Sequence, residues 1–196
     1  DFETEDDNNT WFFTGRTGNV NTWAIGSATF AGDDESGNSA YISNDGGESY
    51  AATVSTTSTY QYIWKDFDFG EDETAVYNLS FDWKATGRIS GTSVYCGILA
   101  YIQEVTDPIP TTTFPSIDEL ALEYGSDTWQ SDTVELRGLT GTKRLMFLTW
   151  GYTNASEIVT PAAIDNISIF TSPCTTAQEI EVSNITTNSA DIAWEG

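Results

Sequence analysis

The chain has 196 residues, of which 30 are Asp or Glu and only 7 are Lys or Arg, and its formal net charge is −23. This shortage of cations argues against partners that are nucleic acids or anionic membrane surfaces. The chain also contains no histidine, which excludes Ser-His-Asp and Cys-His catalytic units and histidine-bound zinc. Carboxylate chemistry, cation binding by oxygen ligands, and recognition by aromatic and hydroxyl groups remain open.

Processing and membrane signals are missing from the sequence. No segment approaches the roughly 20 apolar residues of a membrane-spanning helix, and the acidic start at residues 1–3 is unlike a signal peptide. We therefore expect a mature or excised chain without membrane insertion. Two distant cysteines, Cys96 and Cys174, form neither a disulfide framework nor a thiolate metal cage. The abundance of Thr, Ser, Asn, Asp, Gly and aromatic residues favours a secreted or cell-surface protein.

A hydrophobic period of two dominates the chain and predicts antiparallel β-strands. In residues 77–84 every second side chain is large and apolar, and in residues 60–67 the side chains of Tyr60, Tyr62 and Trp64 share one face. Residues 93–102 are apolar on both faces and predict a central strand. Further strands are predicted at 38–43, 50–56, 128–136, 143–150 and 163–171, and only 115–124 hints at a short helical turn. Together these elements predict an all-β sandwich of two sheets.

A domain boundary is predicted after residue 172. Residues 172–176, Ser-Pro-Cys-Thr-Thr, are typical of a short linker, and two short strands with one apolar face follow. Two strands do not form an independent domain. The segment IEVSNITTNSADIAW resembles the first two strands of a fibronectin type III module, with Trp194 as the second-strand tryptophan. We therefore expect one domain at 1–172, a linker and truncated module at 173–196, and neighbouring domains in a longer polypeptide.

Four segments of the first domain, taken in order, resemble a known family. They are DFE at the start, SAYISNDGG near residue 40, YNLSFDWKA in the middle and PAAIDNISI at the end. These segments are similar to the cleaved-adhesin (choice-of-anchor J) domains of large secreted Bacteroidetes proteins, which are MAM-like jelly rolls. That family often has a Pro-Gly-Trp element after the opening Glu, whereas residues 5–11 keep only the tryptophan. The resemblance implies a two-sheet antiparallel jelly-roll sandwich, adhesion to host proteins or glycans, one structural calcium ion, and no catalytic activity.

A structural calcium ion needs six to eight oxygen ligands from carboxylates, amides and backbone carbonyls. Glu3 in the first strand and Asp165 at the start of the last strand are natural partners if those strands pair. Asp33 and Asn38, from the acidic loop between them, complete the expected set. The segment 44–48, Asn-Asp-Gly-Gly-Glu, is an alternative cage. No EF-hand spacing is present, and the simpler interpretation is that these acids are solvated turn residues.

A bound sugar stacks its apolar face on an aromatic ring and places its polar rim against amide, carboxylate or hydroxyl groups. The chain has 7 Trp, 9 Tyr and 10 Phe. Trp64 and Trp83 lie in alternating strands and are expected in the sandwich core. The loop-adjacent candidates for a ligand site are Trp11, Trp23, Trp129, Trp150, Tyr152 and Asn154. Packing in the core or in turns is the competing interpretation for each aromatic residue.

Glycoside hydrolysis requires two carboxylates about 5–9 Å apart across a cleft. The acids at 71–73 and 118–119 fall in turn-like contexts, and the sequence has no Glu-x-Asp-x-x-Glu strand like the catalytic strand of β-sandwich glucanases. We therefore predict a protein without enzymatic activity: an adhesion or ligand-binding module of a secreted or cell-surface bacterial protein, whose partner is a host or environmental glycan or a surface protein. The alternatives are a structural spacer and, less favoured, a glycoside hydrolase. A binding module predicts an exposed cluster of the aromatic candidates, whereas a spacer buries all of them.

Overall fold

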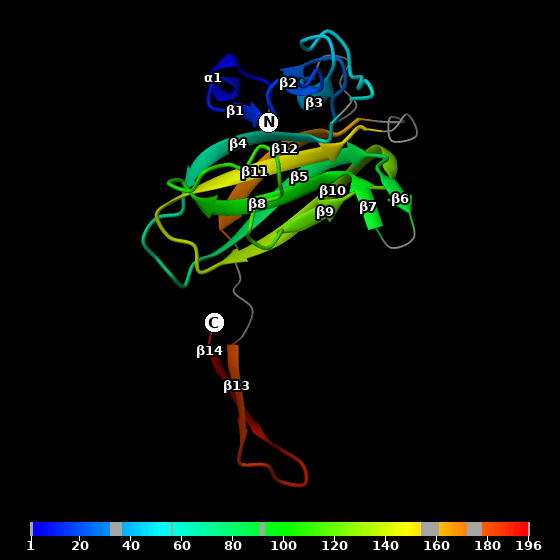
Figure 1. The fold of residues 1–196 in the computed structure, drawn as a ribbon. Helices are drawn as coiled ribbons and strands as arrows, with labels where there is room; N and C mark the ends of the chain where they lie inside the picture. The colour runs from blue at the N-terminus through cyan, green and yellow to red at the C-terminus, as the bar shows by residue number, and fades with distance from the viewer. Residues whose placement is uncertain are drawn as a thin grey trace.

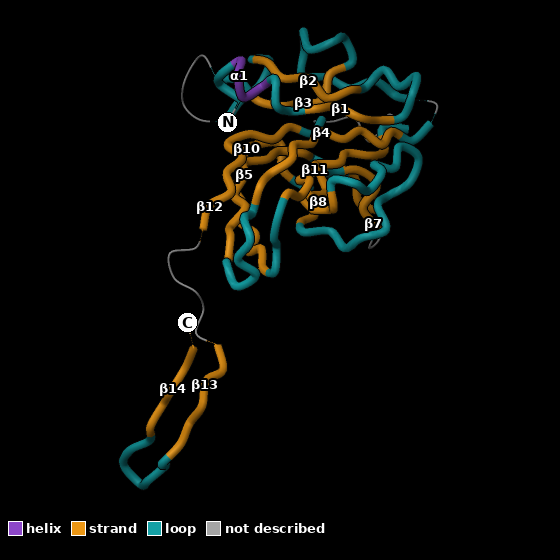
Figure 2. The backbone as a smooth tube through the Cα atoms, turned by 90° about the vertical axis from the view of Figure 1, so that its left-hand side faces the viewer, coloured by secondary structure: helices purple, strands orange, loops and turns teal. Residues whose placement is uncertain are grey.

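The structure, a computed structural model, describes residues 2–31, 37–55, 57–90, 93–153, 161–171 and 178–195. Two five-stranded sheets stack face to face as a β-sandwich (Figures 1 and 2). The strand pairs in the described residues are antiparallel, which confirms the predicted two-sheet antiparallel sandwich. A short helix, α1 (Glu5–Asn8), precedes the strands, and the Thr4 hydroxyl caps it by accepting a hydrogen bond from the Asp7 N–H.

Sheet A has the strand order β1-β4-β11-β8-β9, and sheet B has the order β10-β5-β12-β3-β2. The strands of sheet A are β1 (Phe12–Gly15), β4 (Thr59–Asp68), β8 (Ile98–Glu104), β9 (Ala121–Glu123) and β11 (Thr142–Gly151). The strands of sheet B are β2 (Thr22–Gly26), β3 (Ser39–Ser43), β5 (Val76–Ala85), β10 (Ser126–Arg137) and β12 (Ala163–Thr171). Two hairpins are separate from these sheets: β6 (Arg88–Ser90) with β7 (Ser93–Cys96), and β13 (Gln178–Ser183) with β14 (Asp191–Glu195).

The structure corrects three of the predicted elements. Residues 51–55, predicted as part of a strand, have no regular secondary structure. The helical turn predicted within 115–124 is wrong, because Leu122 of β9 pairs with Leu99 of β8, and sheet pairing outweighs local propensity. The strand predicted at 93–102 is divided at Gly97, where a Cβ atom would lie 2.7 Å from the carbonyl oxygen of Glu123.

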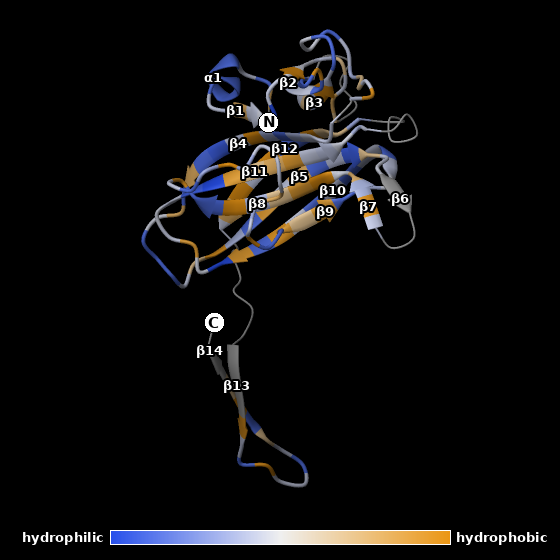
Figure 3. Cartoon of the chain, viewed as in Figure 1, coloured by the Kyte–Doolittle hydropathy of each residue, from blue (hydrophilic) through white to orange (hydrophobic). Residues whose placement is uncertain are grey.

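The main core lies between the two sheets, where alternate side chains of each strand point inward. Phe81 of β5 meets Phe147 of β11 across the gap, with ring centroids 5.2 Å apart. Trp83 belongs to this core, as the sequence predicts. In Figure 3 the hydrophobic colour is concentrated on the strands of the two sheets rather than on the loops.

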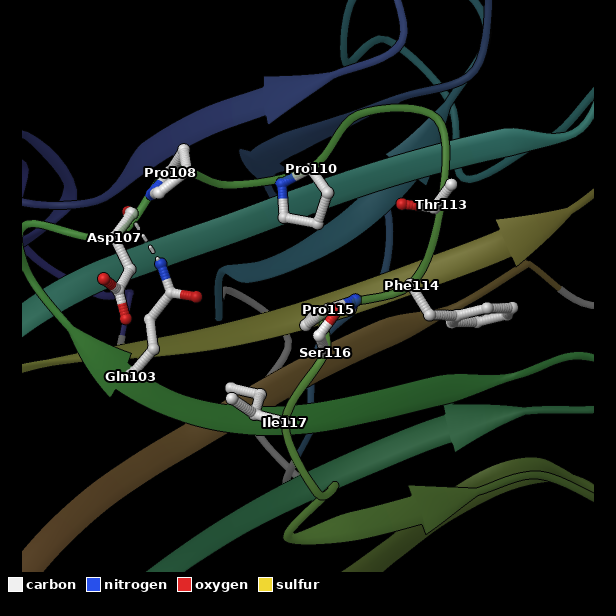
Figure 4. Close-up of a pocket in the computed structure, with 9 residues that line it drawn as sticks. All are labelled: Gln103, Asp107, Pro108, Pro110, Thr113, Phe114, Pro115, Ser116 and Ile117. Atoms are coloured by element: carbon white, nitrogen blue, oxygen red, sulfur yellow. Dashed lines mark hydrogen bonds between the residues drawn. The ribbon is translucent and has the colours of Figure 1, made fainter.

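Sheet A carries a second apolar layer on its outer face. Its buried members are Tyr62, Leu99, Tyr101, Met146, Leu148 and Trp150. Trp64 packs against this outer layer, so its expected place in the sandwich core is wrong. The connection from β8 to β9, residues 105–120, crosses over this layer (Figure 4), and we call it the strap. Sheet A is therefore covered on both of its faces.

Trp23 attaches the edge of one sheet to the other. Its ring is buried in the main core, and its indole Nε1–H donates a hydrogen bond of 2.9 Å to the carbonyl oxygen of Gln61 in β4. Because Trp23 lies in β2, the edge strand of sheet B, this bond joins that edge to sheet A.

The C-terminal hairpin stands apart from the sandwich. In the described chain β13 and β14 pair only with each other, and they extend away from the two sheets in both views (Figures 1 and 2). Val182 and Ile192 lie opposite each other across the hairpin, and both are exposed. Cys174 lies outside the described residues. The boundary at residue 172 and the fibronectin type III assignment stay predictions.

The described part of the chain holds no helix with the length and hydrophobicity of a membrane span.

Glu123 and Asp132 meet at the open side of the sandwich, between the edge strands β9 and β10. Their register partners, Ile98 and Phe81, belong to the main core, so both carboxyl groups face the space between the sheets. Burial raises the pKa of Glu123 to about 7, and hydrogen bonding to Asp132 and the like charge of Asp132 add to this rise.

Trp23→Phe is expected to lower the free energy of unfolding by about 1–3 kcal/mol, because it removes a buried hydrogen bond and part of a core ring. Urea denaturation measures the change. The matched control is Trp129→Phe, since Trp129 is only partly buried; that change should stay within about 0.5 kcal/mol. Equal stability of the two variants would contradict the bridging role of Trp23.

Glu123→Gln is expected to change how stability depends on pH. A carboxyl group whose pKa rises on folding stabilises the fold below its ordinary pKa, and this contribution is lost as the pH rises through about 7. The free energy of unfolding of the variant, relative to that of wild type, should therefore rise by about 1–2 kcal/mol from pH 5 to pH 8. This energy is discounted because Glu123 is partly exposed to solvent. Denaturation at both pH values measures this gain, with Glu71→Gln as the control. Parallel pH profiles for Glu123→Gln and wild type would exclude the effect.

Candidate functional site

The strap is held on the outer face of sheet A by backbone and side-chain hydrogen bonds. At its two ends the Asp107 N–H donates to the Glu104 carbonyl at 3.1 Å, and the Leu120 N–H donates to the Ala100 carbonyl at 2.8 Å. A side chain of the sheet adds a further bond at the first end: Gln103 Nε2 in β8 donates to the Asp107 carbonyl at 3.0 Å. Pro108, Pro110 and Pro115 restrict the backbone and lack N–H donors, so this segment lies over the sheet without joining it as a strand.

Phe114 anchors the middle of the strap. Its ring makes edge-to-face contacts with Tyr60 and Trp150 of sheet A, at centroid distances of 5.3 and 5.5 Å, the geometry that aromatic pairs prefer. The Tyr62 hydroxyl donates to the carbonyl oxygen of neighbouring Thr113 at 3.3 Å. Phe114 nevertheless remains 41% exposed. It therefore serves both as an anchor and as a surface that a ligand can contact.

The first hollow, which we call the strap hollow, lies within the loop of the strap and has a volume of about 380 Å³. Its lining comprises Gln103, Asp107, Pro108, Pro110, Thr113, Phe114, Pro115, Ser116 and Ile117 (Figure 4). Gln103 is only 7% exposed; its Nε2 is bound to the strap, and its Oε1 points into the hollow together with the Thr113 hydroxyl (Figure 4). An amide, a carboxylate and hydroxyl groups thus surround apolar ring surfaces.

The second hollow, which we call the apolar hollow, shares Phe114, Pro115 and Ile117 with the strap hollow and has a volume of about 340 Å³. Its lining comprises Val94, Leu99, Tyr101, Phe114, Pro115, Ile117, Glu119, Leu122 and Trp150. Burial, together with the negative charge of Glu119, raises the pKa of Tyr101 to about 12. Glu119 is the charged group of this lining.

Three of the aromatic candidates from the sequence belong to the core and not to an exposed cluster. Trp11, Trp23 and Tyr152 are at most 6% exposed. Trp11 packs against Phe2, with centroids 5.4 Å apart, and the Tyr152 hydroxyl accepts a hydrogen bond from the Ala162 N–H at 3.1 Å. The expectation that these three residues are exposed is wrong, because the sandwich uses large rings to fill the space between its sheets.

Of the remaining candidates, Trp129 and Trp150 lie in strands of different sheets. Trp150 is 8% exposed and forms part of the apolar hollow. Trp129 lies in β10 of sheet B, where the Lys84 ammonium group stands 5.1 Å from its ring and 4.5 Å from the ring of Tyr50. Burial lowers the pKa of Lys84. Asn154 lies outside the described residues.

Of the four predicted calcium ligands, Glu3 contacts the backbone of Asn38, although Glu3 precedes α1 and does not lie in a strand as expected. The Glu3 carboxylate accepts a hydrogen bond from the Asn38 backbone N–H at 2.9 Å. The Asp165 carboxylate, 1% exposed, accepts one from the Ala31 N–H at 3.0 Å. Burial raises the pKa of Asp165, and the nearby charge of Glu3 raises it further. Asp33 lies outside the described residues, and the described chain contains no group of three or more acidic, His or Cys side chains arranged for a metal.

Residues 44–48, the alternative cage, form a turn that side-chain hydrogen bonds stabilise. The Asp45 carboxylate accepts hydrogen bonds from the Ser43 hydroxyl at 2.6 Å and from the Ser49 N–H at 3.0 Å. These bonds lower the pKa of Asp45 to about 2. Its oxygens therefore already hold the turn together.

The linings of the two hollows do not contain a pair of carboxylates suited to glycoside hydrolysis. Glu123 and Asp132 are within hydrogen-bonding reach of each other, which leaves no space for a sugar between them. The strap hollow contains Asp107 as its carboxylate, and the apolar hollow contains Glu119. Each hollow thus lacks the opposing pair that this reaction requires.

The strap was not recognised from the sequence as a site. Its signal is the run Asp-Pro-Ile-Pro-Thr-Thr-Thr-Phe-Pro-Ser at 107–116, in which prolines and hydroxyl residues surround one phenylalanine. This composition follows a strand that is apolar on both faces and therefore needs an outer cover. Only the two observations together indicate a covering segment.

No protein-family model matches the chain, and no curated protein matches it. Among solved structures, it is similar to the enzymatically active domain of tailspike protein 4 of bacteriophage CBA120, with 13% identity and a TM-score of 0.53, over 83% of this chain and 19% of that chain. It is similar to the K1 cleaved adhesin domain of Lys-gingipain from Porphyromonas gingivalis W83, with 16% identity and a TM-score of 0.50, over 82% of this chain and 90% of that chain. TmCBM61, solved with β-1,4-galactotriose, has 11% identity and a TM-score of 0.46, over 83% and 88% of the two chains.

Identities this low establish a shared fold and nothing finer. The chain spans about a fifth of the tailspike chain but most of the cleaved adhesin domain. Its two antiparallel sheets therefore have the fold of a cleaved-adhesin-like jelly-roll sandwich, as expected from the sequence resemblance.

Proposed function

We propose that this chain is a non-catalytic ligand-binding module of a secreted or cell-surface bacterial protein, and that it binds a neutral glycan in the strap hollow. The observation that carries this proposal is the buried Gln103 amide, whose Oε1 points into a hollow that also presents the Thr113 hydroxyl and the exposed Phe114 ring (Figure 4). A sugar offers hydroxyl groups to the amide and hydroxyl, and an apolar face to the ring.

The charge of the chain favours a neutral ligand over an acidic one. With a net charge of −23 and the Asp107 carboxylate at the rim of the hollow, an acidic sugar would be repelled. The volume of about 380 Å³ lies in the range of small-ligand sites. Absence of catalysis belongs to the same proposal, and it is supported by the single carboxylate in the lining of the hollow.

A structural spacer is the second candidate function. The burial of Trp11, Trp23 and Tyr152 in the core favours it, because those aromatic side chains are then explained by packing alone. The two functions differ in what they require of the strap hollow: a spacer needs no ligand there, whereas the proposed module does.

We also propose that Glu3 and Asp165 hold one structural calcium ion. The support is the chemistry of the donors: two neighbouring carboxylates, one of them buried and with its pKa raised by burial and by the charge of the other. A divalent cation relieves such repulsion and takes oxygen ligands of this kind. Bound there, the ion would join the start of the chain to β12.

A glycan array tests the binding function, with neutral and acidic glycans probed in buffer with millimolar calcium and again with EDTA. Wild type should bind a neutral class, and Thr113→Val should weaken that binding about 3–10-fold through loss of one hydrogen bond. The Thr113 carbonyl that holds the strap is unchanged in this variant. Thr133→Val, at an exposed position of β10, is the matched control and should bind like wild type.

Phe114→Ala should weaken glycan binding more strongly than Thr113→Val, and Phe170→Ala is its control, because Phe170 is 45% exposed on the other sheet. An array without binding in either buffer would reject the glycan function and leave the spacer.

Thermal unfolding tests the calcium proposal. With a dissociation constant on the order of 0.1–1 mM, 10 mM CaCl₂ should stabilise wild type by about 1.4–2.7 kcal/mol more than an ionic-strength-matched NaCl buffer. Glu3→Gln should abolish this gain, whereas Glu5→Gln in α1 should retain it. An equal response of wild type and Glu3→Gln to calcium would reject Glu3 as a ligand.

A further inference from the structure

The apolar hollow differs from the strap hollow in the chemistry of its lining. Its walls are mainly hydrocarbon, from aliphatic side chains such as Leu99 and Leu122 and from the rings of Phe114 and Trp150. Its polar groups are the Glu119 carboxylate and the hydroxyl of Tyr101, a residue that is only 3% exposed. Most hydroxyl groups of a sugar would find no hydrogen-bond partner here, and burying an unpaired hydroxyl group is costly. The hollow instead fits a large apolar side chain.

Several large apolar side chains are exposed around this hollow. Phe114 is 41% exposed, and Ile117 and Leu122 are each 37% exposed, although all three line the hollow. Tyr124, which follows the edge strand β9, is also 37% exposed. Contiguous apolar surface of this kind on a soluble domain marks an interaction site.

Packing against sheet A holds the walls of the hollow in place. Phe114 is fixed between Tyr60 and Trp150. At Gly97, a Cβ atom would lie 3.3 Å from Cβ of Tyr124 and 3.4 Å from the ring of Trp150, so the absence of a side chain lets these residues approach each other. A preformed hollow requires little ordering when a partner binds.

The negative charge beside the apolar hollow favours a partner that carries positive charge next to its apolar side chain. The exposed Glu119 lies in the lining, and the exposed Asp118 precedes it. A second copy of this chain, with its own net charge of −23, would be repelled, and so would an acidic partner. A partner with Lys or Arg beside the apolar residue would be attracted and would pair with Glu119.

We propose that the apolar hollow docks a peptide segment of another protein, in which one large apolar side chain enters the hollow and a flanking Lys or Arg pairs with Glu119. This contact goes beyond the glycan function and uses a different hollow. The module would thus hold a protein partner beside its glycan site.

Two peptides of equal length test the proposal: acetyl-Gly-Lys-Leu-Phe-Lys-Gly-amide and its counterpart with Glu in place of both Lys. Isothermal titration at 20 mM NaCl should show at least about tenfold tighter binding of the Lys peptide, and the ratio should fall at 500 mM NaCl as the charges are screened. The indole N–H resonance of Trp150 should shift when the Lys peptide is added.

Two variants identify the hollow as the site. Leu122→Ser should lower the affinity for the Lys peptide at least about tenfold. Val20→Ser, at a position 54% exposed in a loop, should leave this affinity unchanged. Glu119→Lys should reverse the preference toward the Glu peptide, whereas Glu73→Lys in the β4–β5 turn should keep it. Because Leu122 and Glu119 are exposed, both variants should retain the circular dichroism spectrum of wild type.

The proposal is overturned if neither peptide binds at millimolar concentration, if both bind alike, or if Glu119→Lys keeps the wild-type preference. Thr113→Val separates this result from the glycan result. This variant should weaken glycan binding and leave the affinity for the Lys peptide unchanged, so each function can fail without the other.

Discussion

Sheet A has apolar side chains on both of its faces, and the rest of the structure depends on how those two faces are covered. Sheet B covers the inner face, where Phe81 meets Phe147. The strap lies over the outer face, and its prolines prevent it from pairing as a strand. Because one irregular segment cannot cover a whole sheet, part of the outer face stays open beside Phe114. The two hollows are these open parts.

The positions of the aromatic residues explain why fold and binding surface are separate in this domain. Trp11, Trp23 and Tyr152 fill the sandwich, and the hydrogen bond from Trp23 to Gln61 joins one sheet to the other. Phe114, in contrast, stabilises the strap by its edges and keeps part of its ring in solvent. A ligand that contacts the strap therefore meets a surface held by the sheet beneath it, and no core residue has to move.

The strands were predictable because alternation is a local property. The pattern at 77–84 is a strand in the structure, with Leu79 and Phe81 buried as expected. The pattern at 60–67 also forms a strand, but the side of that strand which faces the other sheet was not predictable. Tyr62 is buried beneath the strap and Ile63 in the sandwich, and period-two alternation by itself does not distinguish two apolar faces.

The sequence by itself determined the all-β class, the positions of the long strands, the absence of histidine chemistry and the acidic character that disfavours anionic ligands. It also indicated Glu3 and Asp165 as partners, since the start and end of a jelly roll are neighbours in the fold that it resembles. Only the tertiary structure decided which aromatic side chains are buried and that residues 105–120 lie over sheet A. The physical reason is that burial and hollows arise from contacts between strands far apart in the chain, whereas hydrophobic periodicity reports only on neighbours along it.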